Sequence, residues 1–460
     1  MVNTLYLPEL REYLSEGNEA ELREFCTALH PARTAEFMEG LTAPEAWAVL
    51  KHAEPHQREQ IFIYFDHEKQ IEVLEGQDRA EIAALIEELA SDDRVDLIHE
   101  LQPGVVDELL PLLSPDIRRN IQRLRAYPEG TAGAVMTTEF ARLAGSLTVR
   151  EALDELSRQS EHLETIYYLY IIDAEGHLRG TVTTRQLVSG IGKPDIRLGD
   201  IMETELIVAN VRDDQEDVAR KVARYDLLAI PVVDDELRML GIITHDDIID
   251  VVREEAVEDV QRMAGVTPLD ESYLRTPLIT LSWKRGMWLA ILFFTALFTA
   301  SALKYYEERL KEWPWLIMFI PLIMSSGGNS GNQSATLIIA AISTGDVSLK
   351  DWYRVVRREL IVGLMLGGFL AGCGFLVSWL LTLNEPTARQ YALQLLVVPG
   401  TLVLVVTCGA VFGSLLPMLF KRLGLDPALM SNPFVAGISD ILAIVIYMSV
   451  ANLLLGTLAG

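Results

Sequence analysis

The 460-residue chain has few of the residues from which disulfides, thiolate metal centres and ATPase sites are built. Its three cysteines, Cys26, Cys373 and Cys408, lie in one helical and two apolar segments, which indicates neither a disulfide framework nor a cysteine-based metal site. No phosphate-binding loop of the form Gly-x4-Gly-Lys-Ser/Thr occurs, so we do not expect an ATP-driven pump. We also expect a protein that is not an enzyme. The N-terminus is polar and has no basic-then-apolar signal segment, so we expect the soluble part to stay in the cytoplasm.

Basic residues are scarce in the first part of the chain. Residues 1–275 hold 56 acidic and 27 basic side chains, a net charge of −29, whereas residues 276–460 hold 9 acidic and 12 basic side chains, a net charge of +3. An acidic soluble half is therefore joined to an apolar half. The acidic balance argues against nucleic acid or anionic lipid as partners and favours cations as ligands, although an ordinary solvated acidic surface would give the same composition.

Strand-like alternation is also scarce before residue 130. Apolar residues recur there at three- and four-residue spacing in short units broken by Pro, Gly and Asp, such as Glu21–Leu29, Pro44–Lys51 and Arg79–Leu89. We predict an acidic all-α N-terminal domain over residues 1–130, built as a superhelical stack of helix pairs.

An internal repeat follows this helical region. The matching segments are Val135-Met136-Thr137 with Ile201-Met202-Glu203, Tyr170–Asp173 with Pro231–Asp234, and Gly180–Thr183 with Gly241–Thr244. Each copy has the pattern strand, helix, strand, hairpin turn, strand, helix. The pattern resembles a pair of CBS modules, which are α/β units, over residues 134–195 and 198–252.

CBS pairs often bind adenine nucleotides, so ATP or another adenine nucleotide is a candidate cofactor. The Thr and Asp of Thr244-His245-Asp246-Asp247 would suit a ribose and a phosphate. The first copy departs from this pattern, because Thr183-Thr184-Arg185-Gln186 has Gln where an Asp is common.

Residues 246–270 are predicted to connect the soluble half to the membrane, with one helix over Asp246–Val266. Asp247, Asp250, Glu254 and Glu258 fall at spacings of three and four and form one stripe. Glu255 and Asp259 lie beside this acidic stripe. The opposite face of the helix is an apolar stripe of Ile249, Val252, Ala256, Val260 and Met263. Stacked carboxylates repel one another unless a cation or basic residues neutralise them, so a cation-responsive role competes with that of a solvated helix face.

The last part of the chain, residues 276–460, contains long apolar segments. We predict five membrane helices, near residues 284–303, 313–342, 354–382, 391–420 and 428–457. Eight basic residues flank these segments on one side and four on the other. The eight are Lys284, Arg285, Lys350, Arg354, Arg357, Arg358, Lys421 and Arg422, and the four are Lys304, Arg309, Lys311 and Arg389. This asymmetry predicts that the soluble half is cytoplasmic and the C-terminus is outside.

Two of these segments carry polar groups that a lipid-facing helix does not need. The stretch from Pro433 to Leu455 contains a single charge, Asp440, which would mark an ion pathway or else bond a neighbouring helix. Ser431-Asn432-Pro433 opens it with oxygen ligands and a proline that frees a backbone carbonyl. The second segment holds the run Gly327–Gln333, whose glycines suit close packing but whose three amides favour a pore lining with non-helical or closely approached backbone. The glycines of the third segment, Gly363, Gly367, Gly368, Gly372 and Gly374, look like close packing.

The whole architecture resembles the MgtE family of magnesium channels. Gly327–Gln333 and Asp426–Pro433 through Ser439-Asp440 look like the membrane motifs of that family. The resemblance implies a multi-domain membrane protein with an all-α superhelical N domain, an α/β CBS pair, a long connecting (plug) helix and a five-helix transmembrane domain. It also implies a homodimer with one pore on the two-fold axis, lined by the second and fifth membrane helices.

The resemblance further implies roles for individual residues. Asp440 would hold the permeating ion, Asn332 and Asn432 would line the pore, and Asp426 would lie near its cytoplasmic mouth. Regulatory Mg²⁺ would bind to a larger set of carboxylates: Asp92, Asp96, Glu216, Asp226, Asp247, Asp250, Glu255, Glu258 and Asp259. Asp92 and Asp96 match by the Asp spacing of Ser91–His99 alone.

The implied function is a Mg²⁺-selective channel for magnesium uptake that cytosolic Mg²⁺ closes. Mg²⁺ prefers octahedral oxygen coordination with retained waters, which two Asp440 carboxylates and nearby amides would satisfy. No His or Cys lies near this site, which disfavours zinc and copper but not Mn²⁺ or Co²⁺. A proton- or Na⁺-coupled carrier and a non-conducting Mg²⁺ sensor are the alternatives.

Overall fold

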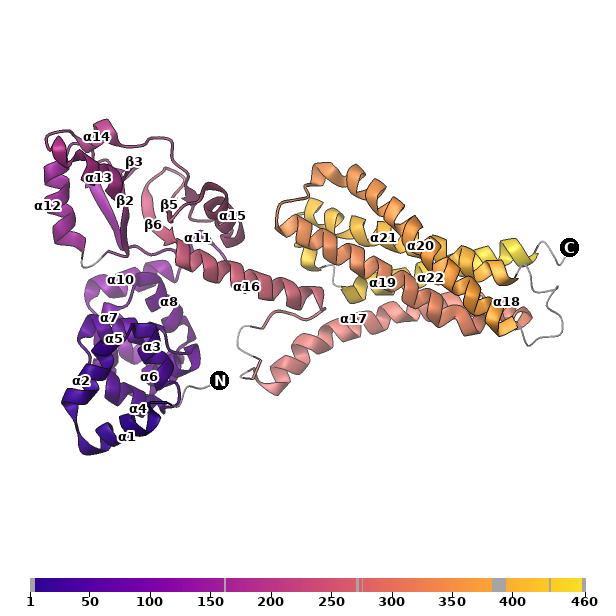
Figure 1. The fold of residues 1–460 in the computed structure, drawn as a ribbon, viewed down its shortest axis with the longest axis horizontal. Helices are drawn as coiled ribbons and strands as arrows, with labels where there is room; N and C mark the ends of the chain where they lie inside the picture. Colours follow the sequence, from indigo (N-terminus) through magenta and orange to yellow (C-terminus); the bar gives the residue numbers. More distant parts are fainter. Residues whose placement is uncertain are drawn as a thin grey trace. The chain divides into compact units, whose positions relative to one another are not determined.

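The computed structural model describes residues 5–160, 163–269, 273–274, 276–382, 394–429 and 432–456 (Figure 1). The chain divides into two compact units, Met1–Arg253 and Glu254–Gly460, and the boundary falls inside the helix α16 (His245–Met263). The two units are described separately.

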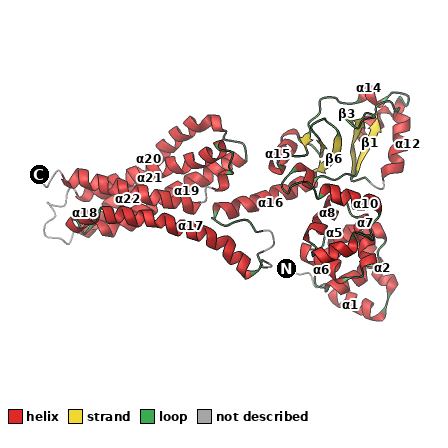
Figure 2. Cartoon of the chain, turned by 180° about the vertical axis from the view of Figure 1, so that it is seen from behind, coloured by secondary structure: helices red, strands yellow, loops and turns green. Residues whose placement is uncertain are grey.

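The N-terminal part of the first unit is entirely helical in the residues that the structure describes (Figure 2). Its helices are α1 (Leu7–Glu16), α2 (Glu19–Ala28), α3 (Pro31–Met38), α4 (Ala43–Leu50), α5 (Pro55–Ile63), α6 (His67–Gly76), α7 (Arg79–Glu88), α8 (Ser91–Glu100), α9 (Pro103–Leu109) and α10 (Pro115–Leu124). From α3 onward each helix packs against the second helix after it, as α3 on α5 and α5 on α7. The predicted all-α stack is confirmed.

The same capping arrangement recurs along this stack. Arg58, Arg94 and Arg118 each donate to a backbone carbonyl eight residues earlier, at 3.1, 2.8 and 2.7 Å respectively. Gln70 does the same with the carbonyl of Phe62 at 3.1 Å. The last carbonyls of a helix lack intrahelical donors, so these side chains satisfy groups that would otherwise be buried without a partner.

Two copies of the predicted α/β unit follow, and each forms a three-stranded sheet with one parallel and one antiparallel strand pair. The first copy contains α11 (Ala132–Val135), β1 (Phe140–Ala144), α12 (Val149–Gln159), β2 (Thr165–Ile172), β3 (Leu178–Thr183), α13 (Thr184–Ser189) and the 3-10 helix η2 (Gly190–Gly192). The second contains α14 (Leu198–Ile201), β4 (Ala209–Asn210), α15 (Gln215–Tyr225), β5 (Ala229–Val233), β6 (Met239–Thr244) and the start of α16. The element order predicted from the repeat is confirmed.

The two copies exchange the segments that precede their first strands. Thr137, which precedes β1, and Ile242 of β6 exchange two backbone N–H···O hydrogen bonds of 2.8 and 2.9 Å. Glu203, which precedes β4, and Thr181 of β3 exchange two such bonds of 2.9 and 3.0 Å. Gly180 and Gly241 stand where these segments cross, since a Cβ on either would lie within 2.9 Å of a methionine sulfur. This exchange explains why the repeat in the sequence includes Val135-Met136-Thr137 before the first strand of one copy and Ile201-Met202-Glu203 before the first strand of the other.

The second unit consists of long helices. Its elements are α17 (Leu278–Tyr305), α18 (Glu307–Glu312), α19 (Leu316–Ser343), the 3-10 helix η3 (Leu349–Asp351), α20 (Trp352–Thr382), α21 (Gln394–Arg422), the 3-10 helix η4 (Pro427–Leu429) and α22 (Asn432–Gly456). Among the described residues, α17, α20, α21 and α22 are long and apolar enough to cross a membrane. The helix α19, 28 residues long, contains the Gly-amide run and is not among these four, so five membrane spans stay a prediction.

Glycines bring α19 and α21 into backbone contact. A Cβ on Gly413 would lie 2.1 Å from the carbonyl oxygen of Gly331, and a Cβ on Gly409 would lie 2.5 Å from that of Gly327. Three glycines of α20 also lie close to α21, because a Cβ on Gly363, Gly367 or Gly374 would lie 2.6–2.8 Å from an atom of that helix. A Cβ on Gly368 or Gly372 would meet nothing within 4 Å. Close packing is therefore confirmed for three of the five glycines in the third apolar segment.

The structure bears on two polar features predicted in the membrane segments. The Gly-amide run does not interrupt α19, which is helical throughout, so of the two backbone arrangements expected for the run the closely approached one is observed and the non-helical one is not. Pro433 is the second residue of α22 and opens the segment as expected, but an amide at this position would have no acceptor within the helix, so the proline frees no carbonyl of α22. Ser431 and Arg389 lie outside the described residues.

The connecting helix ends at Met263, before the predicted ends at 266 and 270. Gly265 has a φ of 71°. Its backbone amide donates to the carbonyl of Arg262 at 2.9 Å, and the backbone amide of Val266 donates to the carbonyl of Gln261 at 2.9 Å. This pair of bonds is the Schellman arrangement that terminates a helix. The apolar stripe predicted on α16 is exposed within the chain at Ile249, Val252 and Val260, which are 55%, 54% and 61% exposed.

Candidate ion-pathway and cation-sensing sites

Asp440 lies on α22 beside the glycine run of α19. It is half-buried, and a Cβ on Gly328 would lie 3.9 Å from its Oδ1 oxygen. Asp440 makes no hydrogen bond or ion pair with another residue that the structure describes. Within the described residues, the carboxylate does not bond a neighbouring helix, which was the structural alternative for this residue.

Two more oxygens on this part of the helix pair α19 and α22 lack a partner. Asn332 Oδ1 and Ser439 Oγ are buried and make no hydrogen bond among the described residues. A Cβ on Gly331 would lie 3.0 Å from Ser439 Oγ, so the hydroxyl faces the glycine run. Buried polar atoms are normally satisfied, and unsatisfied oxygens near a carboxylate suit a hydrated hard cation.

Asn432 and Asp426 lie near the other end of this path. Thr336 of α19 donates to Asn432 Oδ1 at 3.2 Å, so this amide is held against α19. Asp426 Oδ1 accepts from the backbone amide of Ala428 at 2.8 Å and thereby caps η4. The guanidinium of Arg262 is paired with both Asp426 and Glu258.

The last two turns of α16 belong to this unit and contact the same region. Ser343, the last residue of α19, donates to Asp259 Oδ2 at 3.2 Å. Burial raises the pKa of Glu258 and of Asp259, and the neighbouring carboxylates of Glu255 and Asp426 raise both pKa values further. The structure thus brings together four predicted acidic residues, Glu255, Glu258, Asp259 and Asp426, around Arg262, a residue that the sequence did not single out.

A second group of carboxylates lies in the first unit, where α5 and α8 meet the CBS pair. We call it the carboxylate cluster, and it comprises Glu59, Asp92, Asp93, Glu164, Asp246, Asp247 and Asp250. Asp92 is 8% exposed, and its Oδ1 oxygen is buried without a hydrogen-bond partner among the described residues. Burial and then Asp247 hold the pKa of Asp92 well above its ordinary value, while burial raises that of Asp247 to about 6.

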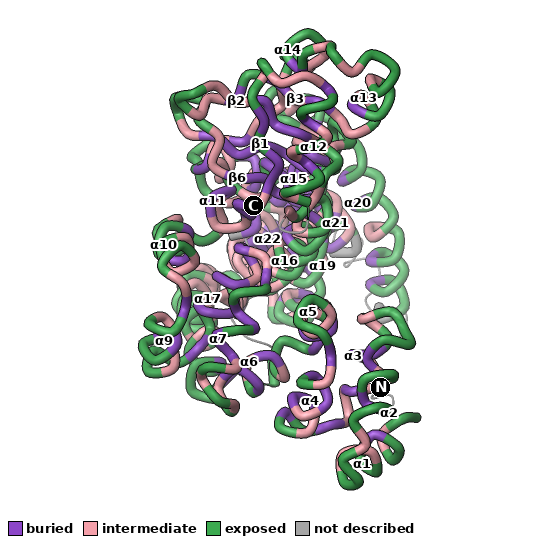
Figure 3. Tube along the Cα trace, turned by 90° about the vertical axis from the view of Figure 1, so that its left-hand side faces the viewer, coloured by how far each residue is buried: buried purple, intermediate pink, exposed green. Residues whose placement is uncertain are grey.

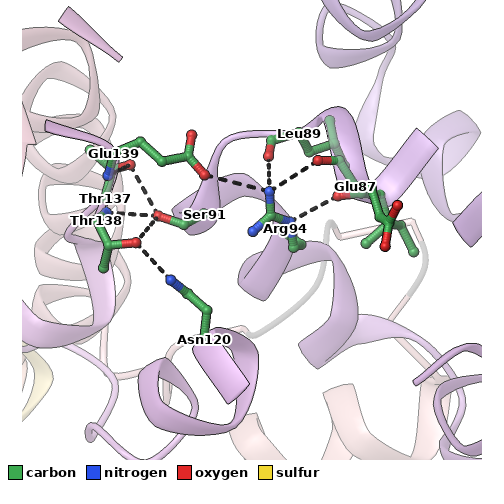
Figure 4. A network of polar contacts seen from close by, with 9 residues as sticks. Glu87, Leu89, Ser91, Arg94, Asn120, Thr137, Thr138 and Glu139 are labelled. Atoms are coloured by element: carbon green, nitrogen blue, oxygen red, sulfur yellow. Dashed lines mark hydrogen bonds and ion pairs between the residues drawn. The ribbon is translucent and has the colours of Figure 1, made fainter. Parts of the chain in front are cut away.

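A polar network fixes α8 beside the start of the first CBS copy (Figure 4). Ser91 Oγ accepts from the backbone amide of Thr138 at 2.8 Å, and Asn120 of α10 donates to Thr138 Oγ1 at 2.7 Å. Arg94 donates to the carbonyls of Ile86 and Leu89 and pairs with Glu139 at 3.5 Å. These bonds hold the first turn of α8, and with it the backbone of Asp92 and Asp93, against the first CBS copy.

The carboxylate cluster predicts an unusual pH dependence when no divalent cation is present. Burial raises the pKa of Glu59 and of Glu164 to about 7, above their unfolded value of about 4.5. The folded state then binds more protons than the unfolded state between about pH 4.5 and 7, so stability falls as pH rises through that window. We expect the unfolding temperature in EDTA to be several degrees higher at pH 5 than at pH 8. An unfolding temperature that is constant or rises over this range would contradict the assignment.

The remaining predicted ligands have other surroundings. Glu216 and Asp226 lie at the two ends of α15, where Glu216 pairs with Arg220 at 3.9 Å and Asp226 ends the helix with a φ of 50°. Asp96 is exposed on α8, one turn beyond Asp92. Their roles as ligands stay predictions.

The proposed nucleotide-binding residues satisfy each other in this structure. Thr244 Oγ1 donates to Asp247 Oδ2 at 2.6 Å, and Thr183 Oγ1 donates to Gln186 Oε1 at 2.9 Å in the first copy. Both pairs cap the helix that follows. Binding of ATP or another adenine nucleotide stays a prediction.

Sequence reasoning missed four members of the carboxylate cluster as ligands: Glu59, Asp93, Glu164 and Asp246. They come from helices and loops far apart in the chain, so no spacing links them. Asp246 stands next to a residue that was chosen, and Asp93 directly follows Asp92, so adjacency to a predicted ligand was the available indication.

The fold and these sites define a membrane protein that handles cations and carries an acidic regulatory unit. Three family models match the chain: the MgtE divalent cation transporter over residues 320–450, the MgtE intracellular N domain over 29–130 and the CBS domain over 132–193 and 198–254. The chain belongs to the MgtE family of divalent cation transporters.

Individual relatives agree with this assignment. The Magnesium transporter MgtE of Thermus thermophilus is 37% identical over 97% of this chain and 98% of its own length. The Magnesium transporter MgtE of Enterococcus faecalis is 38% identical over 72% of this chain and 71% of its own length. The crystal structure of the soluble part of a magnesium transporter matches with a TM-score of 0.51 and 35% identity, covering 54% of this chain and 97% of that one.

Proposed function

We propose that the chain forms a Mg²⁺-selective channel for magnesium uptake that cytosolic Mg²⁺ closes. The observation that carries the proposal is Asp440, a carboxylate within an apolar helix that has no protein partner in the described residues. It lies beside Gly328 of α19, and the same two helices hold the unpartnered oxygens of Asn332 and Ser439. An all-oxygen donor set suits a hard divalent cation that keeps part of its water shell. The relatives named as magnesium transporters support Mg²⁺ as the substrate.

The closing step is proposed to act through α16. This helix carries Asp247 and Asp250 of the carboxylate cluster near its start and Glu255, Glu258 and Asp259 near its end. Cations that neutralise both groups would favour a compact, closed state over an open one, because they bind the two states with different affinity. Neutralisation is needed because buried like charges otherwise destabilise the compact state.

We also infer a homodimer with the soluble half in the cytoplasm and the C-terminus outside. The apolar stripe Ile249, Val252 and Val260 is exposed within one chain, which supports a second copy as its cover. The excess of basic residues beside one set of helix ends supports the orientation. A pore on the dimer axis would place two Asp440 carboxylates opposite each other.

The test is Mg²⁺ flux into vesicles that contain the purified chain. We expect uptake driven by a Mg²⁺ gradient alone, unchanged by adding a proton or Na⁺ gradient. Vesicles without protein provide the baseline, and Asp351→Asn, which changes a carboxylate that caps η3, provides a variant control. Uptake that begins only when a proton or Na⁺ gradient is imposed would replace the channel with the coupled carrier.

A further inference from the structure

The start of α20 presents a groove lined by arginine, tyrosine and aliphatic side chains. Two neighbouring rows of the helix form it, Tyr353, Arg357 and Ile361 in one and Arg354, Arg358 and Val362 in the other. The groove has a volume of about 530 Å³. The residues that line it are exposed, and α20 as a whole is drawn largely in the colour of exposed residues in Figure 3.

The arginines of this groove are not neutralised by the protein. Arg354 pairs with Asp351 at 3.1 Å and is still 86% exposed. Arg357 and Arg358 make no ion pair with any residue that the structure describes. The nearest carboxylate in sequence, Glu359, accepts instead from Ser334 of α19 at 2.6 Å. Two guanidinium groups therefore present unused donors to the groove.

The rest of the groove has the character of a membrane boundary. Trp352 and Tyr353 are 55% and 63% exposed at the helix start, and tryptophan and tyrosine favour the headgroup level of a bilayer. Beyond the arginines the same helix exposes Ile361, Met365 and Phe369, at 52%, 70% and 70%. The exposed surface of α20 thus changes from aromatic and cationic at the helix start to purely apolar further along. A phospholipid changes in the same order, from its polar headgroup and phosphate to its acyl chains.

We propose that this groove binds the headgroup phosphate of an anionic phospholipid, with the acyl chains along the apolar face of α20. Guanidinium groups bind phosphate oxygens through paired hydrogen bonds, and basic pockets at the end of a membrane helix suit anionic headgroups. The acidic composition that argues against anionic lipid belongs to residues 1–275, whereas the groove lies in the unit whose net charge is positive. The contact is independent of the ion pathway, because none of the lining residues belongs to it.

Native mass spectrometry of the full chain in detergent measures this binding directly. We expect the wild type to retain phosphatidylglycerol in preference to phosphatidylcholine. The double variant Arg357→Gln with Arg358→Gln should weaken that binding about tenfold or more, since each basic residue near an anionic surface contributes on the order of 1 kcal/mol. The single variants Arg357→Gln and Arg358→Gln should each lose part of the phosphatidylglycerol binding. If the double variant does not fold, the lipid binding of the single variants tests the proposal in its place.

The matched control is Lys421→Gln with Arg422→Gln, which removes the same charge from the end of α21 and leaves the groove intact. This control should bind phosphatidylglycerol as the wild type does. An equal loss of phosphatidylglycerol binding in both double variants would overturn the proposal, because it would show that the lipid responds to the overall surface charge and not to the groove. Glycerol phosphate, which has no acyl chains, should not displace the lipid at millimolar concentration. Displacement by it would identify a soluble phosphate site and overturn the lipid. Loss of dimer mass in the groove variants, with unchanged lipid binding, would assign the groove to a second copy.

Discussion

Replacing Asp440 with alanine is expected to abolish Mg²⁺ flux in vesicles while the protein still folds. The carboxylate is the one charge in α22, and its neighbours Asn332 Oδ1 and Ser439 Oγ have no partners among the described residues. Hydrogen bonds from a hydrated cation to a charged group contribute about 1.5–3 kcal/mol each, so losing two of them would reduce occupancy by roughly a hundredfold or more. Flux should fall below detection in an assay that resolves a hundredfold decrease.

Two further substitutions separate charge from size at this position. Asp440→Asn keeps the shape but removes the charge and should behave like alanine, whereas Asp440→Glu keeps the charge and should retain part of the flux. The unfolding temperature of each variant should match the wild type within a few degrees, because Asp440 bonds no described residue. Flux in Asp440→Ala at half the wild-type level or above would remove Asp440 from the pathway.

Neutralising the carboxylate cluster is expected to remove the response of the protein to Mg²⁺. In the double variant Asp92→Asn with Asp247→Asn, two like charges that repel each other at a buried site become neutral groups of the same size. Relief of a buried, unpartnered charge stabilises by about 1–3 kcal/mol, and this should raise the unfolding temperature in EDTA by about 5 °C. Mg²⁺ should stabilise the wild type strongly and the variant little.

The same variant should conduct Mg²⁺ but close less readily when Mg²⁺ is raised on the side of the soluble unit. The matched control is Asp195→Asn with Asp200→Asn, which removes the same charge from exposed positions of the first unit. This control should retain both the Mg²⁺-dependent unfolding temperature and closure. A cluster variant with a wild-type response in both assays would show that these carboxylates do not sense Mg²⁺.

Features that depend on local pattern could be predicted from the sequence. The repeat predicted the three strands and the two longer helices of each CBS copy because strand alternation, hairpin turns and helix periodicity are local properties, whereas the short helices α11, η2 and α14 were not predicted. The single charge in α22 identified Asp440 because an apolar helix gives such a residue no ordinary role. Gly363, Gly367 and Gly374 were correctly assigned to close packing because few other uses exist for glycine in an apolar helix.

Features that depend on distant segments meeting could not be predicted. Glu59 and Glu164 join Asp92 only because the polar network around Ser91 places α8 against the CBS pair, and nothing in their spacing indicates this. Arg262 pairs with Asp426, 164 residues away. The run Gly327–Gln333 left a non-helical and a closely approached backbone open, and the contact with the distant helix α21 shows the second of these.

The glycine contacts between α19 and α21 restrict how an ion path beside Asp440 can widen. With Gly413 so close to the carbonyl of Gly331, sliding either helix by the 1.5 Å rise of one residue would drive a neighbouring side chain into the opposing backbone. These two helices must therefore travel as a single rigid body. The glycines of α19 meet α22 less closely than they meet α21, since a Cβ on Gly331 would lie 3.0 Å from the side chain of Ser439 and a Cβ on Gly328 would lie 3.6 Å from that of Ala436. A wider space between α19 and α22 would therefore require movement of α22, the helix that carries Asp440, relative to the pair α19 and α21.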